Sequence, residues 1–145
     1  MLIPTCLIKL CELMLTVACL TLHHYSYDLT DVPTLMLCSG TYVGYVVVLS
    51  GEIVGEAVSA AADAYVDAWW SSSGSVLFAM CGGLTLHSWR TVPLNDRKNL
   101  AQAAAICALA NASLLLIDAL IAICSAHKDD AEGSIRTKCP KNAPC

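Results

Sequence analysis

Four long apolar runs, each about the length of a membrane-spanning helix, dominate the sequence. They extend over about 2–22, 35–58, 70–89 and 100–124. A helix needs about 20 residues to cross a hydrocarbon core of roughly 30 Å. Backbone amides at membrane depth must be satisfied within the fold, and these runs lack the alternation of barrel strands. We therefore expect an all-α fold, a four-helix transmembrane bundle over residues 1–124.

The composition supports a bilayer environment. Hydrophobic residues make up 57% of the 145 residues and charged residues 14%, whereas soluble proteins average roughly a quarter charged. So few charges would not cover the surface of a water-soluble domain of this size. The net charge of −4 also argues against nucleic acid as a partner, because phosphate binding needs clustered Lys and Arg.

The polar segment 125–145 follows the last run, and we expect it to be a flexible cytoplasmic tail. An even number of spans places both ends of the chain on one side. The tail carries four basic residues and the opposite side three, so cytoplasmic termini are only slightly favoured. The first run could also be a cleaved signal peptide, but Lys9 and Glu12 interrupt it and no basic region precedes it, which favours a span.

The cysteines and tryptophans are placed as expected for a membrane bundle. Seven of the nine cysteines lie in or beside the apolar runs, and we interpret them as small apolar fillers rather than disulfide partners. Tryptophans at the ends of the third run are predicted interfacial anchors, namely Trp69, Trp70 and Trp89. Three cysteines at or after the fourth run are candidates for lipidation by palmitate, namely Cys124, Cys139 and Cys145.

Glycines form a stripe along the second run. Gly40, Gly44, Gly51 and Gly55 lie within about 60° of one another at 100° per residue. Small residues on one face let membrane helices approach closely. We therefore predict a helix-packing face here. The pattern favours packing within the bundle, and a homo-oligomer face is the alternative.

Charged residues inside the runs come to a common depth. Lys9, Glu52 and Asp118 each lie roughly 9–10 Å inside the same interface. Ions in hydrocarbon cost on the order of 3 kcal/mol or more, so they should pair inside the bundle. The hypothesis is an interhelical pair of Lys9 with Asp118 or Glu52. The full predicted intramembrane polar network comprises Lys9, Glu12, Glu52, Glu56, Asn111 and Asp118.

The sequence contains no recognisable catalytic constellation. His23, His24 and His87 could be drawn as a metal site, but nothing in the sequence fixes them in ligand geometry. The serines at 71–75 lack a base at a recognisable spacing, so helix packing explains them better than nucleophilic chemistry does. We expect no enzyme activity, no cofactor and no metal.

Several short motifs, in order, resemble the insect snakeskin-like family of small four-span membrane proteins. They are Ile8-Lys9-Leu10, Ser39-Gly40 with Val43-Gly44, Glu52-Ile53-Val54, Gly83-Leu84 leading to Leu86-His87-Ser88-Trp89, and Asn111 followed by Leu115-Leu116-Ile117-Asp118. The similarity covers nearly the whole chain. Snakeskin-like proteins are MARVEL-like membrane proteins of smooth septate junctions in insect epithelia.

The resemblance implies a non-enzymatic membrane organiser at the plasma membrane of cell-cell junctions. Its expected partners are membrane lipid and other junction membrane proteins in the same membrane, with a homo-oligomer as a further possibility. An alternative function is a small ion channel or proton-linked transporter subunit that uses the intramembrane carboxylates.

Overall fold

A computed structural model describes residues 2–26, 31–58 and 63–138. They form α-helices without any strand in these ranges. The helices are α1 (Leu2–Ser26), α2 (Val32–Ala57), α3 (Ala64–Ser88) and α4 (Asp96–Lys138). The expected all-α fold is therefore present.

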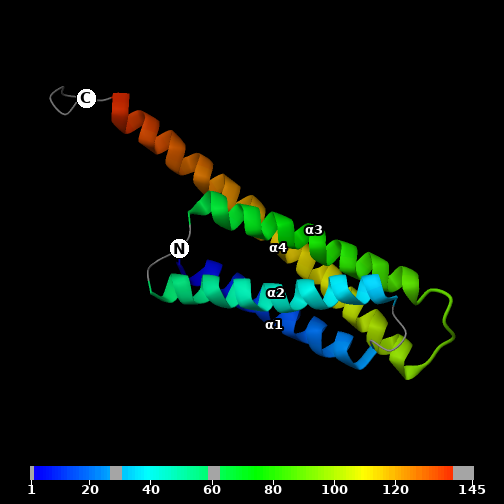
Figure 1. Ribbon diagram of the computed structural model, residues 1–145. Helices are drawn as coiled ribbons and strands as arrows, with labels where there is room; N and C mark the ends of the chain where they lie inside the picture. Colours follow the sequence, from blue (N-terminus) through cyan, green and yellow to red (C-terminus); the bar gives the residue numbers. More distant parts are fainter. Residues whose placement is uncertain (1, 27–30, 59–62, 139–145) are drawn as a thin grey trace.

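The four helices run alternately back and forth (Figure 1). Each packs against its neighbour in the chain, and α1 also packs against α4, which closes the bundle. The contact between α3 and α4 is the most extensive, and that between α2 and α3 is the sparsest. The start of α1 and the end of α4 lie toward the same end of the bundle (Figure 1).

Three of the helices are long and apolar enough to cross a membrane. The qualifying segments are Pro4–Ser26, Val32–Ala57 and Asp96–Ile135. Helix α3 is not clearly a span, because serine, glycine and threonine residues dilute its apolar character. The described part of the chain is accordingly helical with three apolar candidate spans, and a fourth crossing stays a prediction.

Helix ends differ from the predicted boundaries where polar residues occupy a helix terminus. Helix α3 begins at Ala64, with Asp63 at its N-cap position and Asp67 in its first turn, so most of the acidic segment 63–67 is helical. Acidic residues are favourable there because of the positive helix N-terminus. Sequence hydropathy finds only the apolar part of such a helix.

The prediction of a flexible tail from residue 125 is wrong for residues 125–138. Helix α4 continues without a break to Lys138. Alanine and glutamate in this stretch favour the helix, Ala126 is buried, and the Tyr65 hydroxyl donates a 2.6 Å hydrogen bond to Asp130. The first proline after the helix is Pro140, and residues 139–145 lie outside the described part of the chain.

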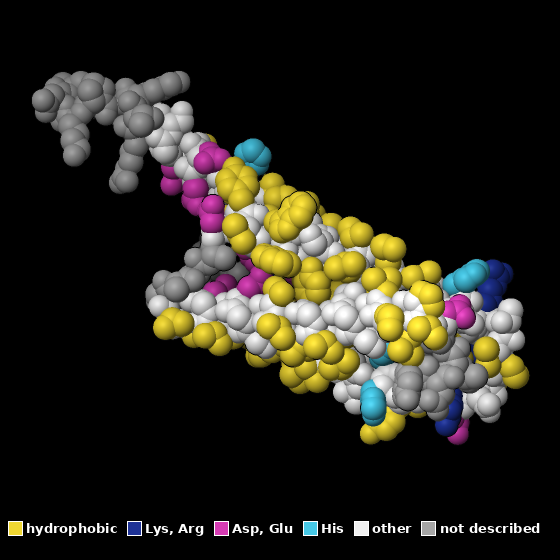
Figure 2. Space-filling model, in the orientation of Figure 1, with side chains coloured by type: hydrophobic (Ala, Val, Ile, Leu, Met, Phe, Trp, Pro, Cys, Tyr) yellow, Lys and Arg dark blue, Asp and Glu magenta, His cyan; other side chains and the backbone are white. Residues whose placement is uncertain are grey.

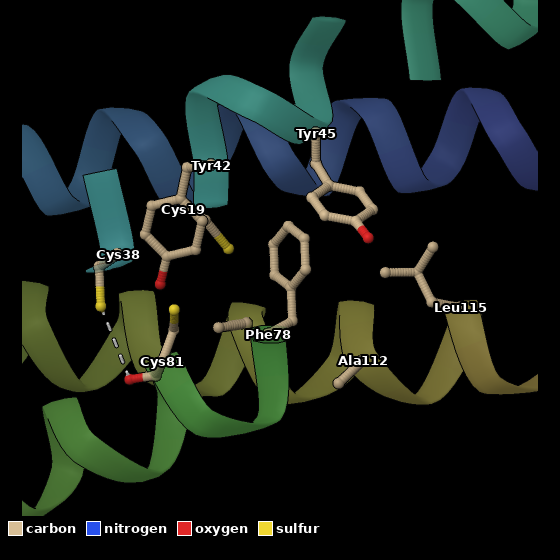
Figure 3. Close-up of a cluster of buried hydrophobic side chains, with 9 residues drawn as sticks. Cys19, Cys38, Tyr42, Tyr45, Phe78, Cys81, Ala112 and Leu115 are labelled. Atoms are coloured by element: carbon tan, nitrogen blue, oxygen red, sulfur yellow. Dashed lines mark hydrogen bonds between the residues drawn. The ribbon is translucent and has the colours of Figure 1, made fainter. Parts of the chain in front are cut away.

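Aromatic and sulfur-containing side chains fill the middle of the bundle (Figure 3). The Phe78 ring lies between Tyr42 and Tyr45, with both ring-centroid distances 5.5 Å. Buried cysteines from three helices complete this aromatic core, namely Cys19, Cys38 and Cys81. All seven cysteines of the described ranges are free, which agrees with their interpretation as apolar fillers.

Candidate functional site

A buried ammonium group joins all four helices at one end of the bundle. Lys9 of α1 is 2% exposed. Its Nζ lies 2.6 Å from Asp118 Oδ2 of α4 and 3.0 Å from Glu52 Oε2 of α2. The predicted pairing of Lys9 with Asp118 or Glu52 is therefore present with both partners, because the three residues share one level along the bundle.

Two members of this cluster are absent from the predicted network. Lys9 Nζ also contacts Asp67 Oδ1 at 2.7 Å and donates to Ser71 Oγ at 3.3 Å. Ser71 in turn donates to Asp118 Oδ2 at 2.8 Å. Asp67 and Ser71 are four residues apart and so share a face of α3. That spacing would have revealed them if α3 had been expected to begin before Asp67.

Glu12 and Asn111 lie deeper along the same interface. Thr16 Oγ1 donates to the backbone oxygen of Glu12 at 2.7 Å and accepts from Asn111 Nδ2 at 3.0 Å. The Glu12 and Asn111 side chains are fully buried, and neither carboxyl oxygen of Glu12 has a hydrogen-bond partner. Asn111 Oδ1 is also unpartnered. We call Lys9, Glu12, Glu52, Asp67, Ser71, Asn111 and Asp118 the ionic cluster.

A pocket of about 350 Å³ leads from the outside of the molecule to the ionic cluster. Its polar lining is Lys9, Glu52, Glu56 and Asp67, and its apolar lining includes Trp70. Figure 2 shows acidic side chains gathered in the hollow between the ends of α2 and α3, with hydrophobic side chains over the flanks. Glu56, the remaining member of the predicted network, lines this acidic pocket and has one buried, unpartnered oxygen.

The predicted packing of the glycine stripe within the bundle is not found at three of its positions. A Cβ atom added at Gly40, Gly44 or Gly51 would meet no atom within 4 Å. Gly55 and Gly51 line the acidic pocket. The glycines follow one face of α2, as their spacing predicts, but at Gly40, Gly44 and Gly51 no residue of the described ranges packs directly against that face.

Instead, Gly40 and Gly44 line a shallow groove of about 340 Å³ between α2 and α3. Its apolar walls include Met36, Leu77 and Trp70. Val48 and Trp70 line both this groove and the acidic pocket, so the two hollows are adjacent. We call the apolar part the glycine groove.

Close helix approach inside the bundle uses other glycines. A Cβ atom at Gly74 of α3 would lie 2.5 Å from a ring carbon of Tyr45, whose hydroxyl donates to the Trp70 carbonyl at 3.0 Å. At Gly82 it would lie 2.9 Å from Leu109 Cγ. These contacts bring α2 and α4, respectively, against α3.

The predicted interfacial tryptophans divide into two kinds. Trp69 is 69% exposed and Trp70 is exposed too, as anchors facing lipid or headgroups would be. Trp89 is only 2% exposed and its backbone N–H donates to Thr85 at the end of α3. The prediction that Trp89 is an outward-facing anchor is wrong, because the turn after α3 folds its ring into the bundle.

The histidines and the lipidation candidates lie apart from the ionic cluster. His23 Nε2 is 3.2 Å from Ser39 Oγ, and its ring meets Tyr42 edge-on at 5.6 Å, so it serves the packing of α1 against α2. His24 and His87 are exposed. Cys124 is exposed on α4, whereas Cys139 and Cys145 lie outside the described residues.

The arrangement holds one positive charge among three carboxyl groups and leaves an open apolar groove between α2 and α3. Comparison with protein-family models, with curated proteins and with solved structures gives no significant match for the chain.

Proposed function

We propose that the chain is a non-enzymatic integral membrane protein that assembles a septate-type epithelial junction by packing side by side with other membrane proteins. The observation that carries the proposal is the glycine groove. Gly40 and Gly44 leave the backbone of α2 open along a face that no described helix covers. A helix from another membrane protein would approach closely here.

The physical basis is the way helices associate in lipid. Hydrocarbon is as apolar as leucine, so burying apolar side chains provides little drive, and close packing at small residues matters more. The rims of the groove carry exposed Met36 and Trp70, which supply contact area on either side of an incoming helix. A second copy of this chain is one possible occupant, and another junction protein is the one we favour.

We further propose that α3 crosses the membrane together with α1, α2 and α4. Its extensive contact with α4 would remove its polar side chains from lipid, and Ser75 Oγ already donates to the Ala112 carbonyl at 2.8 Å. Four crossings would place both termini on one side, which we propose is the cytoplasm. The start of α1 and the end of α4 lie toward the same end of the bundle, which supports this arrangement (Figure 1).

The junctional location rests on the resemblance to the snakeskin-like family described above. The connections between helices support a role within one membrane. The segment from Trp89 to Asn95 separates α3 from α4, and so short a loop offers little area for an opposing cell. Adhesion between cells would therefore come from the partners.

The aromatic core favours assembly over the alternative of a channel. Tyr42, Tyr45 and Phe78 fill the space between helices beyond the ionic cluster (Figure 3). Packed side chains therefore occupy the bundle interior beyond the ionic cluster. A conducting path would require these rings to move apart.

The proposal is tested by filling the groove. In a polarised insect epithelium, the wild-type chain should concentrate at junctions, and Gly44→Leu should spread over the cell surface while remaining folded. Gly83→Leu is the matched control, since Gly83 also has open space around it but lies outside the groove. Uniform staining of the wild-type chain would contradict a junctional role.

A cross-linking experiment identifies the occupant of the groove. A photoreactive side chain at Met36, on the groove wall, should give a cross-link to a second membrane protein. The same group at Ile106, exposed on α4, should give none. A cross-link between two copies of this chain would show that a second copy, rather than another membrane protein, occupies the groove.

A further inference from the structure

The ionic cluster holds more acidic than basic groups. Each helix contributes one carboxyl group, and the cluster contains one ammonium group. Lys9 binds three of these carboxyl groups directly. Glu12 is the fourth, and its electrostatic neighbours are Asp118, Lys9, Glu52 and Asp67. Three of the four charged groups that act electrostatically on Glu12 are therefore acidic.

Within the ionic cluster, the buried side-chain atoms left without partners are all oxygen acceptors, whereas Trp89 Nε1, a buried donor without a partner, lies outside it. Glu12 is 0% exposed, and its Oε1 and Oε2 have no hydrogen-bond partner. Asn111 Oδ1 is likewise buried and unpartnered. The one hydroxyl between them, that of Thr16, already donates to the Glu12 backbone. The interior of the cluster thus has unused acceptors, and what it lacks is a donor or a positive charge.

We infer that the Glu12 carboxyl group binds one further monovalent cation, a proton or an alkali-metal ion, inside the ionic cluster. An ionised carboxylate without a partner costs several kcal/mol in such an interior, and either cation removes that cost at the same oxygens. Among the described residues no three His, Cys, Asp or Glu side chains are grouped to hold a metal ion. Lys9 already pairs with the carboxyl groups of Glu52, Asp67 and Asp118, which leaves the Glu12 carboxyl group for a cation of single charge.

The acidic pocket supplies a route for the cation. It opens to the outside of the molecule and is lined by Lys9, Glu52 and Asp67, and Lys9 lies three residues before Glu12 on α1, so that the two share a helix face. The aromatic core blocks the far side, so the site binds a cation without passing it on. The inference is independent of the proposed assembly function, because the glycine groove plays no part in it.

The test uses the full-length protein in nanodiscs of uncharged phosphatidylcholine. Replacing sodium by N-methylglucamine at constant ionic strength should lower the Tm by roughly 3 °C if an alkali ion is bound. If a proton is bound, the Tm should not respond to sodium. The infrared spectrum near neutral pH should then contain the C=O band of a protonated carboxylic acid.

Variants assign the response to position 12. Glu12→Gln should abolish the sodium response or the infrared band, whichever the wild-type protein shows. Glu12→Asp keeps a carboxyl group and should retain a sodium response or displace the band. Glu132→Gln, on the exposed end of α4, should behave as wild type.

Three results would overturn the inference. One is a wild-type protein with neither a sodium-dependent Tm nor a protonated-acid band. Another is a sodium-dependent Tm or infrared band that Glu12→Gln leaves unchanged. The third is a sodium-dependent Tm or infrared band that Glu132→Gln abolishes as well. If Glu12→Gln does not fold, the wild-type measurements together with the band displacement in Glu12→Asp decide the question.

Discussion

The ionic cluster and the aromatic core are both buried between the same helices, but they constrain the bundle in different ways. In the cluster, the position of one atom, Lys9 Nζ, is fixed by contacts of 2.6–3.0 Å to three helices. In the core, Phe78 and two tyrosines fill space with ring-centroid distances of 5.5 Å. Sliding one helix by a single residue, about 1.5 Å, would break the ionic contacts.

This difference suggests a division of labour. Apolar cores of conserved volume tolerate rearrangement of their side chains, and they lose uniqueness before they lose stability. A buried charge tolerates little rearrangement of its partners, since an unpaired ion in such an environment is costly. We infer that the ionic cluster sets the register of the four helices and that the aromatic core supplies packing at whatever register the cluster selects.

The largest expected effect comes from removing the ammonium group. Lys9→Met leaves several acidic groups facing one another without a cation and should lower the free energy of unfolding by about 3–5 kcal/mol. Thermal or denaturant unfolding in detergent micelles measures this change. Lys128→Met, at an exposed position of α4, is the control and should change little.

The double variant Lys9→Met, Asp118→Leu separates pairing from simple loss of a side chain. Because it removes one of the stranded carboxylates, it should be more stable than the sum of the two single changes indicates. Strict additivity of the two single effects would show that the 2.6 Å contact does not couple the helices.

A smaller effect is expected from crowding the aromatic core. Gly74→Ala would place a Cβ atom 2.5 Å from the Tyr45 ring, and the resulting shift should cost about 1–3 kcal/mol. Gly44→Ala, at an open position of α2, should be neutral or stabilise the helix by up to about 1 kcal/mol. Equal losses in both variants would mean that the two glycines do not differ in packing.

The hydrogen bonds of Ser71 provide a finer test of the cluster. Ser71→Ala removes the donor to Asp118 and the acceptor for Lys9 but keeps all charges, so it should cost about 1 kcal/mol. Ser113→Ala, whose hydroxyl bonds only within α4 at an exposed site, is the matched control. If Ser71→Ala lowered the free energy of unfolding as much as Lys9→Met does, the view that charge pairing provides most of the cluster's stabilisation would be contradicted.

The sequence predicts the ionic cluster better than it predicts the helix ends. The depth of Lys9, Glu52 and Asp118 follows from residue counting, because helix rise is constant and unpaired charge is excluded from lipid. Residue counting along the apolar runs does not predict Asp67 as a member of the cluster. This residue lies before the apolar part of α3, and whether a polar stretch continues a helix depends on tertiary contacts as well as on hydropathy.

The periodicity of the sequence also does not predict whether a helix face is covered by a neighbouring helix. The spacing of Gly40, Gly44 and Gly51 places them on one face of α2, and the structure agrees. Only the packing of α2 against α1 and α3 decides whether that face is covered, and it is open. Trp89 is the converse case, a residue whose position at the end of an apolar run predicts exposure but whose ring is buried.

The smallest effect is expected at an exposed contact outside the ionic cluster, where the first turn of α3 meets residues 125–138 of α4. The hydrogen bond from Tyr65 to Asp130, with the nearby negative charge, raises the pKa of the Tyr65 hydroxyl above its ordinary value. Asp130→Asn removes that charge, so tyrosinate should form at lower pH, which ultraviolet absorbance titration detects. Asp129→Asn, one residue away on the exposed helix, is the control. Because the contact is open to water, the unfolding free energy should barely change, and a loss comparable to that of Ser71→Ala would show that the end of α4 is coupled to the buried cluster.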